Sequence, residues 1–420
     1  MINKKHFYFL LAITFSLRFL SSWLVKDFKP TLWEYEVLTQ NMLERGEYVF
    51  DYREYGEYKA ILAPGFSVLT YCIYSLFGTS HVIMLFIQYM LMFAAVVAVY
   101  KITVELLENE NYALCAGLMV ALHPGYIHYS SNMLHQLTLY LPLFYWTIFF
   151  LIRAFKTNSS KYFMLAGLAG GGAMLTRATI MPVIVLSLII ILILKRNELK
   201  VTLKNVALGG TLLAIVYSPW VIRNYIVFDK FVFAQTNKWE SFWVGNNPNS
   251  TGGHYRVDGV AILNTKPSEM QKEIDESGSE LLDNEIFKKY AMDFVENNPG
   301  EFVKGLFKKA FYFSWFGPHT GIKYPSKLVI FAKILYAVFL LMTLCGVYYC
   351  YKNKLVNKAF IFPILLLLGV SSVHILYFFE MRHRWTVEPV MMIFASIIPV
   401  LFFEKMKQKF STKPSAGEGS

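Results

Sequence analysis

Residues 111–152 contain no Asp, Glu, Lys or Arg. A helix needs about 20 mainly apolar residues to cross a bilayer, so this segment is long enough for two crossings. The sequence His123-Pro124-Gly125 interrupts it, which predicts a hairpin of two membrane helices. We therefore expect an all-α polytopic membrane protein.

The composition supports this fold class and excludes others. Hydrophobic residues make up 55% of the 420 residues and charged residues 16%, against roughly 25% charged residues in a soluble domain. This excludes a soluble enzyme, a fibrous protein and a disordered chain. The net charge of +11 comes from basic residues spread between apolar segments, so we do not expect a nucleic-acid partner.

The apolar runs predict about ten transmembrane helices, at residues 7–24, 81–100, 112–130, 137–155, 162–176, 178–194, 203–222, 326–350, 359–378 and 386–403. The chain then divides into an N-terminal transmembrane module (1–222) with a first external loop (25–80), an external loop (223–325), C-terminal transmembrane helices (326–404) and a cytoplasmic tail (405–420). A further apolar run follows Ala63-Pro64-Gly65-Phe66. We interpret it as a juxtamembrane or re-entrant helix, because a full span there would reverse every later crossing.

The distribution of Lys and Arg predicts the orientation. Basic residues fill the termini and the loops on their side, whereas the short loops on the other side hold only Arg177, Arg382 and Arg384. The positive-inside rule then puts both termini in the cytoplasm and the two long loops outside a plasma membrane.

Trp33-Glu34-Tyr35-Glu36 opens a predicted amphipathic helix that ends near Gly46. Its apolar stripe, which includes Tyr35 and Leu38, is expected to lie on the membrane surface. At about 100° per residue, Glu34 and Glu36 project about 160° apart, so at most one should enter a shared cavity. The alternative is that both are solvated carboxylates.

Four arginines lie at the external ends of spans: Arg177, Arg223, Arg382 and Arg384. Guanidinium groups bind phosphate well, and charged residues at membrane depth often mark a ligand path. The arginines therefore predict a site for an anionic lipid headgroup. The alternative is that they snorkel to the interface; Glu380 and Glu388 could serve the close pair as counter-charges.

Polar residues elsewhere are weaker candidates. His135 is the histidine of the 123–136 segment expected to face a central cavity, although interfacial anchoring is the default for such residues. Asn246 and Asn247 lie among turn residues that could simply form a loop or could bind a sugar.

The order of these motifs resembles the GT-C superfamily of membrane glycosyltransferases, in the branch similar to protein O-mannosyltransferases and the lipid A aminoarabinose transferase (glycosyltransferase family 39-like). The resemblance covers about 400 residues. It rests on Trp33-Glu34-Tyr35-Glu36, Ala63-Pro64-Gly65-Phe66, Leu175-Thr176-Arg177, Pro219-Trp220 with Arg223-Asn224, Gly245-Asn246-Asn247-Pro248, and Arg382-His383-Arg384 with Glu388-Pro389.

The resemblance implies an inverting enzyme that moves a sugar from a polyprenyl-phosphate carrier to a hydroxyl of a glycan, lipid or protein acceptor at the external face. Glu34, or alternatively Glu36, would be the base, and the arginines would bind the donor phosphate. The first loop has no Asp-x-Asp, so no metal or other cofactor is expected. The alternatives are a lipid-linked-sugar flippase and a polysaccharide polymerase or ligase.

Overall fold

The computed structural model describes residues 2–51, 56–318 and 324–411; residues 412–420 of the expected cytoplasmic tail lie outside the described residues. The described chain is almost entirely helical, with one two-stranded sheet. The long helices and those between them are α1 (Lys4–Lys26), α2 (Glu34–Glu44), α3 (Gly65–Phe77), α4 (His81–Leu107), α5 (Glu110–Leu122), α6 (Pro124–Asn132), α7 (Leu137–Thr157), α8 (Ser160–Thr176), α9 (Met181–Leu194) and α10 (Leu199–Phe228). They are followed by α11 (Lys238–Gly245), α12 (Ser268–Ser277), α13 (Glu280–Asn297), α14 (Pro299–Ser314), α15 (Ser326–Lys352), α16 (Ile361–Leu376), α17 (Met381–Arg384), α18 (Glu388–Ala395) and α19 (Ile397–Ser411).

Seven helical segments of the described chain are long and apolar enough to cross a membrane. The other three predicted spans correspond to α5 with α6, α8, and α9 with the 3₁₀ turn Ala178–Ile180 before it. The all-α polytopic fold class is therefore confirmed. The helices form a bundle in which α7 packs on α4 and α8, α8 packs on α10, and α15 packs on α18.

The helical break predicted at His123-Pro124-Gly125 is present, but the chain reverses later. His123 ends α5, α6 continues to Asn132, and α7 begins at Leu137. Proline cannot donate the hydrogen bond that would continue α5. The fully buried Arg18 donates instead to the carbonyl oxygen of Ala121 at 3.3 Å, so a cation lies at the negative end of α5.

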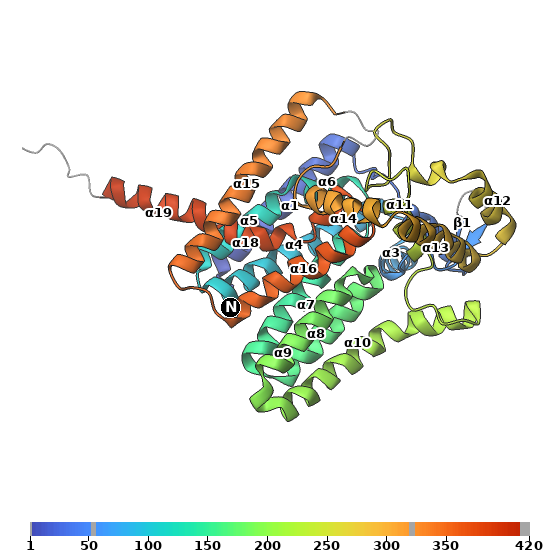
Figure 1. Cartoon of the computed structure of the whole chain (residues 1–420). Coiled ribbons are helices and arrows are strands. Elements are labelled where there is room, and N and C mark those ends of the chain that lie inside the picture. Colours follow the sequence, from blue (N-terminus) through green and yellow to red (C-terminus); the bar gives the residue numbers. More distant parts are fainter. Residues whose placement is uncertain (1, 52–55, 319–323, 412–420) are drawn as a thin grey trace, which may run out of the picture.

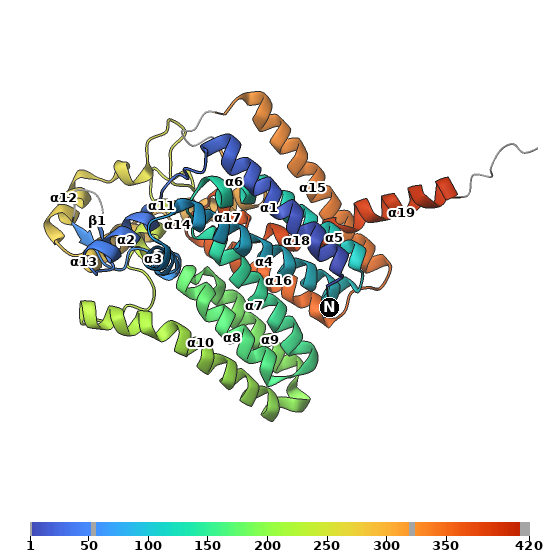
Figure 2. The ribbon, with the colours of Figure 1, turned by 180° about the vertical axis from the view of Figure 1, so that it is seen from behind.

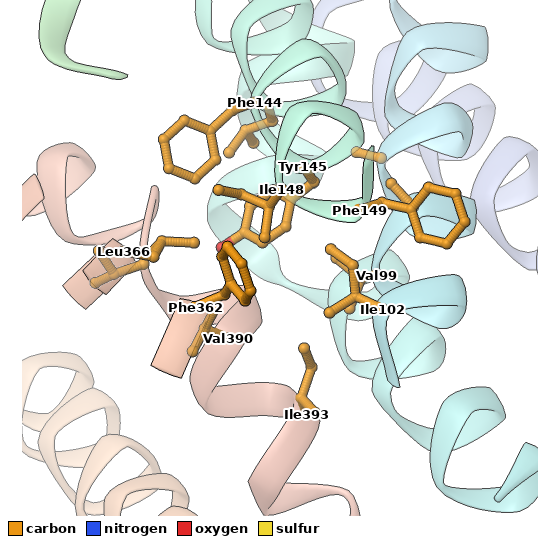
Figure 3. Packing of buried hydrophobic residues seen from close by; sticks show 14 of the residues in the cluster. Val99, Ile102, Phe144, Tyr145, Ile148, Phe149, Phe362, Leu366, Val390 and Ile393 are labelled. Carbon is orange, nitrogen blue, oxygen red and sulfur yellow. The ribbon is translucent and has the colours of Figure 1, made fainter. Parts of the chain in front are cut away.

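The core lies where α4, α7, α16 and α18 meet (Figure 3). Its labelled side chains are Val99, Ile102, Phe144, Tyr145, Ile148, Phe149, Phe362, Leu366, Val390 and Ile393. Segments from both halves of the chain thus form one core. The Tyr145 hydroxyl donates to the carbonyl oxygen of Thr386 at 2.8 Å, which fixes the entry to α18.

The polar segments gather at one end of the bundle, which we call the loop end, opposite the end where α1 begins and α19 lies (Figures 1 and 2). Helix α3 stays there, because Gly65 packs against Thr176 at the end of α8 and Tyr74 binds Glu36. The interpretation of α3 as a juxtamembrane or re-entrant helix stays a prediction. The strands β1 (Phe50–Asp51) and β2 (Glu57–Tyr58) pair antiparallel beside α2.

The expected membrane-facing stripe of α2 is wrong. Tyr35 is 4% exposed and Leu38 is fully buried, because α3 packs across this face of α2. An amphipathic pattern does not distinguish a lipid surface from another helix as the partner of an apolar face.

The second long loop has its own small core, in which α11 packs on α13 and α12 on α13. Glu280 at the start of α13 accepts hydrogen bonds from the backbone N–H groups of Lys59 and Ala60 and from the Thr236 hydroxyl, at 2.7, 3.3 and 2.6 Å. The Tyr58 hydroxyl also donates to Asp283 of α13, so the two long loops are joined through two buried carboxylates.

Candidate functional site

The first turn of α2 carries two carboxylates with different surroundings. Glu36 is 5% exposed and accepts from the Tyr74 hydroxyl at 3.1 Å, with His81 Nε2 at 3.3 Å. Glu34 is half-buried, and no hydrogen bond joins its side chain to another described residue. Both lie at the N-terminal end of the helix, where the positive end of the helix dipole favours a carboxylate. Glu36 therefore anchors α2 to α3 and α4, while Glu34 keeps its oxygens available.

Both carboxylates line one cavity of about 620 Å³. The expectation that at most one could enter a shared cavity is wrong, because Glu34 and Glu36 both line it, together with His81 at the start of α4. The other lining residues are Leu32, Trp33, Val37, Gln40, Asn41, Phe50, Thr79 and His81.

Arg382 lies beside Trp33 and does not line this cavity. Its guanidinium carbon lies 5.3 Å from the centre of the Trp33 ring, and its Nε forms an ion pair with Glu380. Although burial opposes it, the charges of Arg382, His254 and Arg177 hold the pKa of the Glu380 carboxyl below its ordinary value. Glu380 is thus the counter-charge expected for Arg382. Trp33, the residue directly before Glu34, contacts Arg382, which lies near the other end of the chain.

Arg177, which follows α8, joins the same group. It acts electrostatically on Tyr35, Arg382 and Glu380. No hydrogen bond or ion pair joins its guanidinium to another residue in the described ranges. Two guanidinium groups therefore share one carboxylate, which leaves a local excess of positive charge.

His135 completes the group, with its ring edge-on to those of Trp33 and Tyr35. Its Nδ1 accepts the backbone N–H of Leu137 at 3.1 Å. Burial, together with Arg382 and Arg177, lowers the pKa of His135 well below its ordinary value. In a neutral imidazole whose Nδ1 is an acceptor, the proton lies on Nε2.

That Nε2 lies 3.5 Å from Nη1 of Arg382. Arg382 can only donate, so its Nη1 N–H points toward the imidazole, and an anionic oxygen placed beside this pair would face both side chains. We call Arg177, Arg382 and His135 the donor group, because their N–H groups can donate hydrogen bonds to an anion.

Arg384 and Arg223 lie outside this group. The Arg384 side chain is 4% exposed; its Nε donates to Glu388 at 2.8 Å and its guanidinium lies 3.9 Å from the centre of the Tyr336 ring. The counter-charge expected for Arg384 is thereby confirmed. Arg223 donates to the carbonyl oxygens of Lys59 and Tyr48 at 2.7 and 2.9 Å.

Asn246 and Asn247 are also engaged by the protein. The side-chain amides donate to the carbonyl oxygens of Phe242 and Trp243, both at 2.8 Å. Lys309 Nζ donates to Asn246 Oδ1 at 2.7 Å and to the carbonyl oxygens of Tyr377, Gly245 and Leu376 at 2.9, 3.2 and 3.2 Å. These residues join α11, α14 and α16.

The sequence analysis missed several of these residues. Trp33 and Tyr35 were noted only as parts of a helix, and their contacts with His135 follow from packing between distant segments. Lys309 gave no signal, because it is one of several lysines on an amphipathic helix. In the ranges that the structure covers, no group of three or more His, Cys, Asp or Glu side chains is arranged to hold a metal.

Residues 62–222 match the model of a family described as dolichyl-phosphate-mannose-protein mannosyltransferase. A search among curated proteins found no match for the chain. The matched segment runs from just before α3 through most of α10. It includes His135 and Arg177 and excludes Glu34 and Arg382. The match confirms the resemblance to GT-C glycosyltransferases of the family 39-like type.

Proposed function

We propose that the chain, whose residues 62–222 match a mannosyltransferase family, is a membrane glycosyltransferase that transfers a sugar from a polyprenyl-phosphate carrier to an acceptor hydroxyl, with inversion at the anomeric carbon. Glu34 acts as the base. Arg382 and Arg177, with His135, bind the phosphate of the donor. The loop end faces the outside of a plasma membrane, since the short loops at this end hold few basic residues and those at the other end hold many.

The observation that carries this proposal is the donor group. Two guanidinium groups and a neutral imidazole N–H converge near one carboxylate, Glu380. Charged and aligned N–H donors are the groups that bind phosphate oxygens most strongly. The tryptophan that lies over Arg382 directly precedes Glu34. The base and the phosphate-binding groups would therefore act on opposite sides of the anomeric carbon, the base on the incoming hydroxyl and the other groups on the leaving phosphate.

The chemistry balances without an added reactant. Glu34 takes the proton of the acceptor hydroxyl as the oxygen forms a bond to the anomeric carbon. The bond between that carbon and the phosphate oxygen breaks, and its electron pair leaves with the phosphate as a monoester dianion. Arg382, Arg177 and His135 stabilise the charge that develops on the leaving oxygens.

The remaining sequence candidates have supporting roles in this proposal. Arg384 and Glu388 hold the segment that carries Arg382, and Arg223 holds the loop that carries Glu34. Asn246 and Asn247 shape the second loop. Their contacts are with the protein itself, so their effect on the donor would be indirect.

The test is single turnover with purified polyprenyl-phosphate mannose, and with other polyprenyl-phosphate hexoses and pentoses, in detergent or vesicles. E34Q should lower the turnover rate on the order of 10²-fold or more, and R382A should lose transfer through charge stabilisation. Glu301 and Arg256 are exposed and lie in surface ion pairs. E301Q and R256A are therefore the matched controls and should keep full activity.

Full activity of both E34Q and R382A would refute the site. A loss in E36Q with full activity in E34Q would move the base to Glu36. Carrier movement between leaflets without release of sugar would replace the proposal with a flippase.

A further inference from the structure

The cavity beside α2 differs in charge from the donor group. The described residues that line it include the carboxylates Glu34 and Glu36 and no Lys or Arg. His81 is its one ionisable base, and that ring is paired with Glu36. Whichever proton state His81 adopts, the described lining keeps an excess of negative charge when both carboxylates are ionised.

The nearest arginines do not neutralise this charge. Arg382 lies over the Trp33 ring, does not line the cavity and is paired with Glu380. Arg45, at the end of α2, is paired with Asp51 and Glu57. The site thus has a cationic side for a phosphate and an acidic side for a second molecule.

The rest of the lining combines apolar and amide groups. Trp33 and Phe50 provide aromatic surface, and Gln40 and Asn41 add side-chain amides. The volume of about 620 Å³ lies within the range of small-molecule sites. Hydroxyl groups donate well to carboxylates, and aromatic faces favour the C–H surface of a sugar ring.

From this arrangement we propose that the cavity is the acceptor site and that it selects a saccharide without phosphate or carboxylate groups. The inference rests on the proposed function, whose base is Glu34. An anionic acceptor would meet two carboxylates in a partly desolvated space, where charges interact more strongly than in water. A neutral or amino-substituted saccharide would instead donate hydrogen bonds to Glu34, whose oxygens are available.

The experiment compares acceptors at a fixed donor concentration. The probes are neutral disaccharides, an amino sugar disaccharide, the same disaccharides bearing a phosphate or a uronic acid, and a Ser/Thr peptide. We expect kcat/KM for the neutral and amino acceptors to exceed that for their anionic counterparts at least tenfold. The difference should shrink as salt is raised, because ions screen exposed charges.

Val37 provides a matched pair of variants, since it lines the cavity and is 42% exposed. V37R should raise the ratio of anionic to neutral kcat/KM at least fivefold. V37Q has a similar polar bulk without the charge and should leave the ratio unchanged. If Val37 only supports the fold, its substitution would change kcat/KM for anionic and neutral acceptors by the same factor.

The outcomes separate this inference from the proposed function. Equal use of anionic and neutral saccharides, a V37R ratio like that of wild type, or preference for the peptide would overturn the acceptor assignment. Release of polyprenyl phosphate that depends on Glu34 and Arg382 would still support the transferase proposal. Loss of that dependence would refute both.

Discussion

The contact between α8 and α10 allows a sharp test of how the bundle holds its site. A Cβ at Gly167 would lie 2.0 Å from the carbonyl oxygen of Gly209, and one at Gly209 would lie 2.6 Å from that of Phe163. A Cβ at the adjacent Gly210 would meet nothing within 4 Å. Small residues let membrane helices approach this closely. G167A, G209A and G210A therefore form a matched series within one helix pair.

In G167A the new methyl group would clash with the backbone carbonyl of Gly209. A backbone atom cannot move aside by a side-chain rotation. Ordinary contact begins near 3.4 Å, so the helices would have to separate by roughly 1.4 Å, and close-packed interiors do not yield this without loss. We expect G167A to lower the free energy of unfolding by about 3 kcal/mol, at the upper end of overpacking costs. G210A should gain about 0.5–1 kcal/mol from helix propensity.

The assay is reversible unfolding in mixed micelles, with transfer activity measured beside it. Because α8 ends at Thr176, next to Arg177, G167A should also lower activity in the fraction that remains folded. A free energy of unfolding for G167A within about 0.5 kcal/mol of wild type, the usual range of harmless substitutions, would show that the helices can part freely. The argument from packing would then be refuted.

Two further predictions concern buried charges. Burial lowers the pKa of Lys309 from 10.5 to about 7, so the unfolded chain binds more protons between these values. The free energy of unfolding should therefore rise from pH 7 to 10.5, and K309M should flatten this rise in unfolding measured against pH. R384M leaves the buried Glu388 with His123 Nε2, at 2.8 Å, as its remaining ion-pair partner and should cost about 3 kcal/mol, whereas R384M/E388Q should recover part of the loss in the same assay; equal losses in both would contradict the ion-pair account.

The spans could be predicted from the sequence because hydrophobic length is a local property. Helix α4 begins at His81 and α7 at Leu137, where the sequence predicts them. The reversal after α6 lies between the predicted spans 112–130 and 137–155, whereas the break at Pro124 separates α5 from α6 and does not turn the chain. A proline marks a break in a helix without determining the direction in which the chain continues.

The roles of the arginines could not be separated by sequence. Arg382 and Arg384 lie two residues apart, yet their side chains have different partners. Arg382 lies over Trp33, whereas Arg384 forms an ion pair with Glu388 and lies over the Tyr336 ring. Arg223 resembles a headgroup ligand in its sequence, but it binds the backbone of the first loop. These differences depend on which distant segment packs against each arginine. The sequence around an arginine does not predict that partner.

The position of Glu34 depends on contacts made by other parts of the chain. Glu36 fixes the start of α2 to α3 and α4, and Arg223 fixes the following segment to α10. Glu280 then holds the same segment to α13. Each contact is buried or partly buried and involves a charge, so losing one partner is costly. The second loop therefore helps to fix the geometry of the first, and a change in α13 could alter catalysis without touching the cavity.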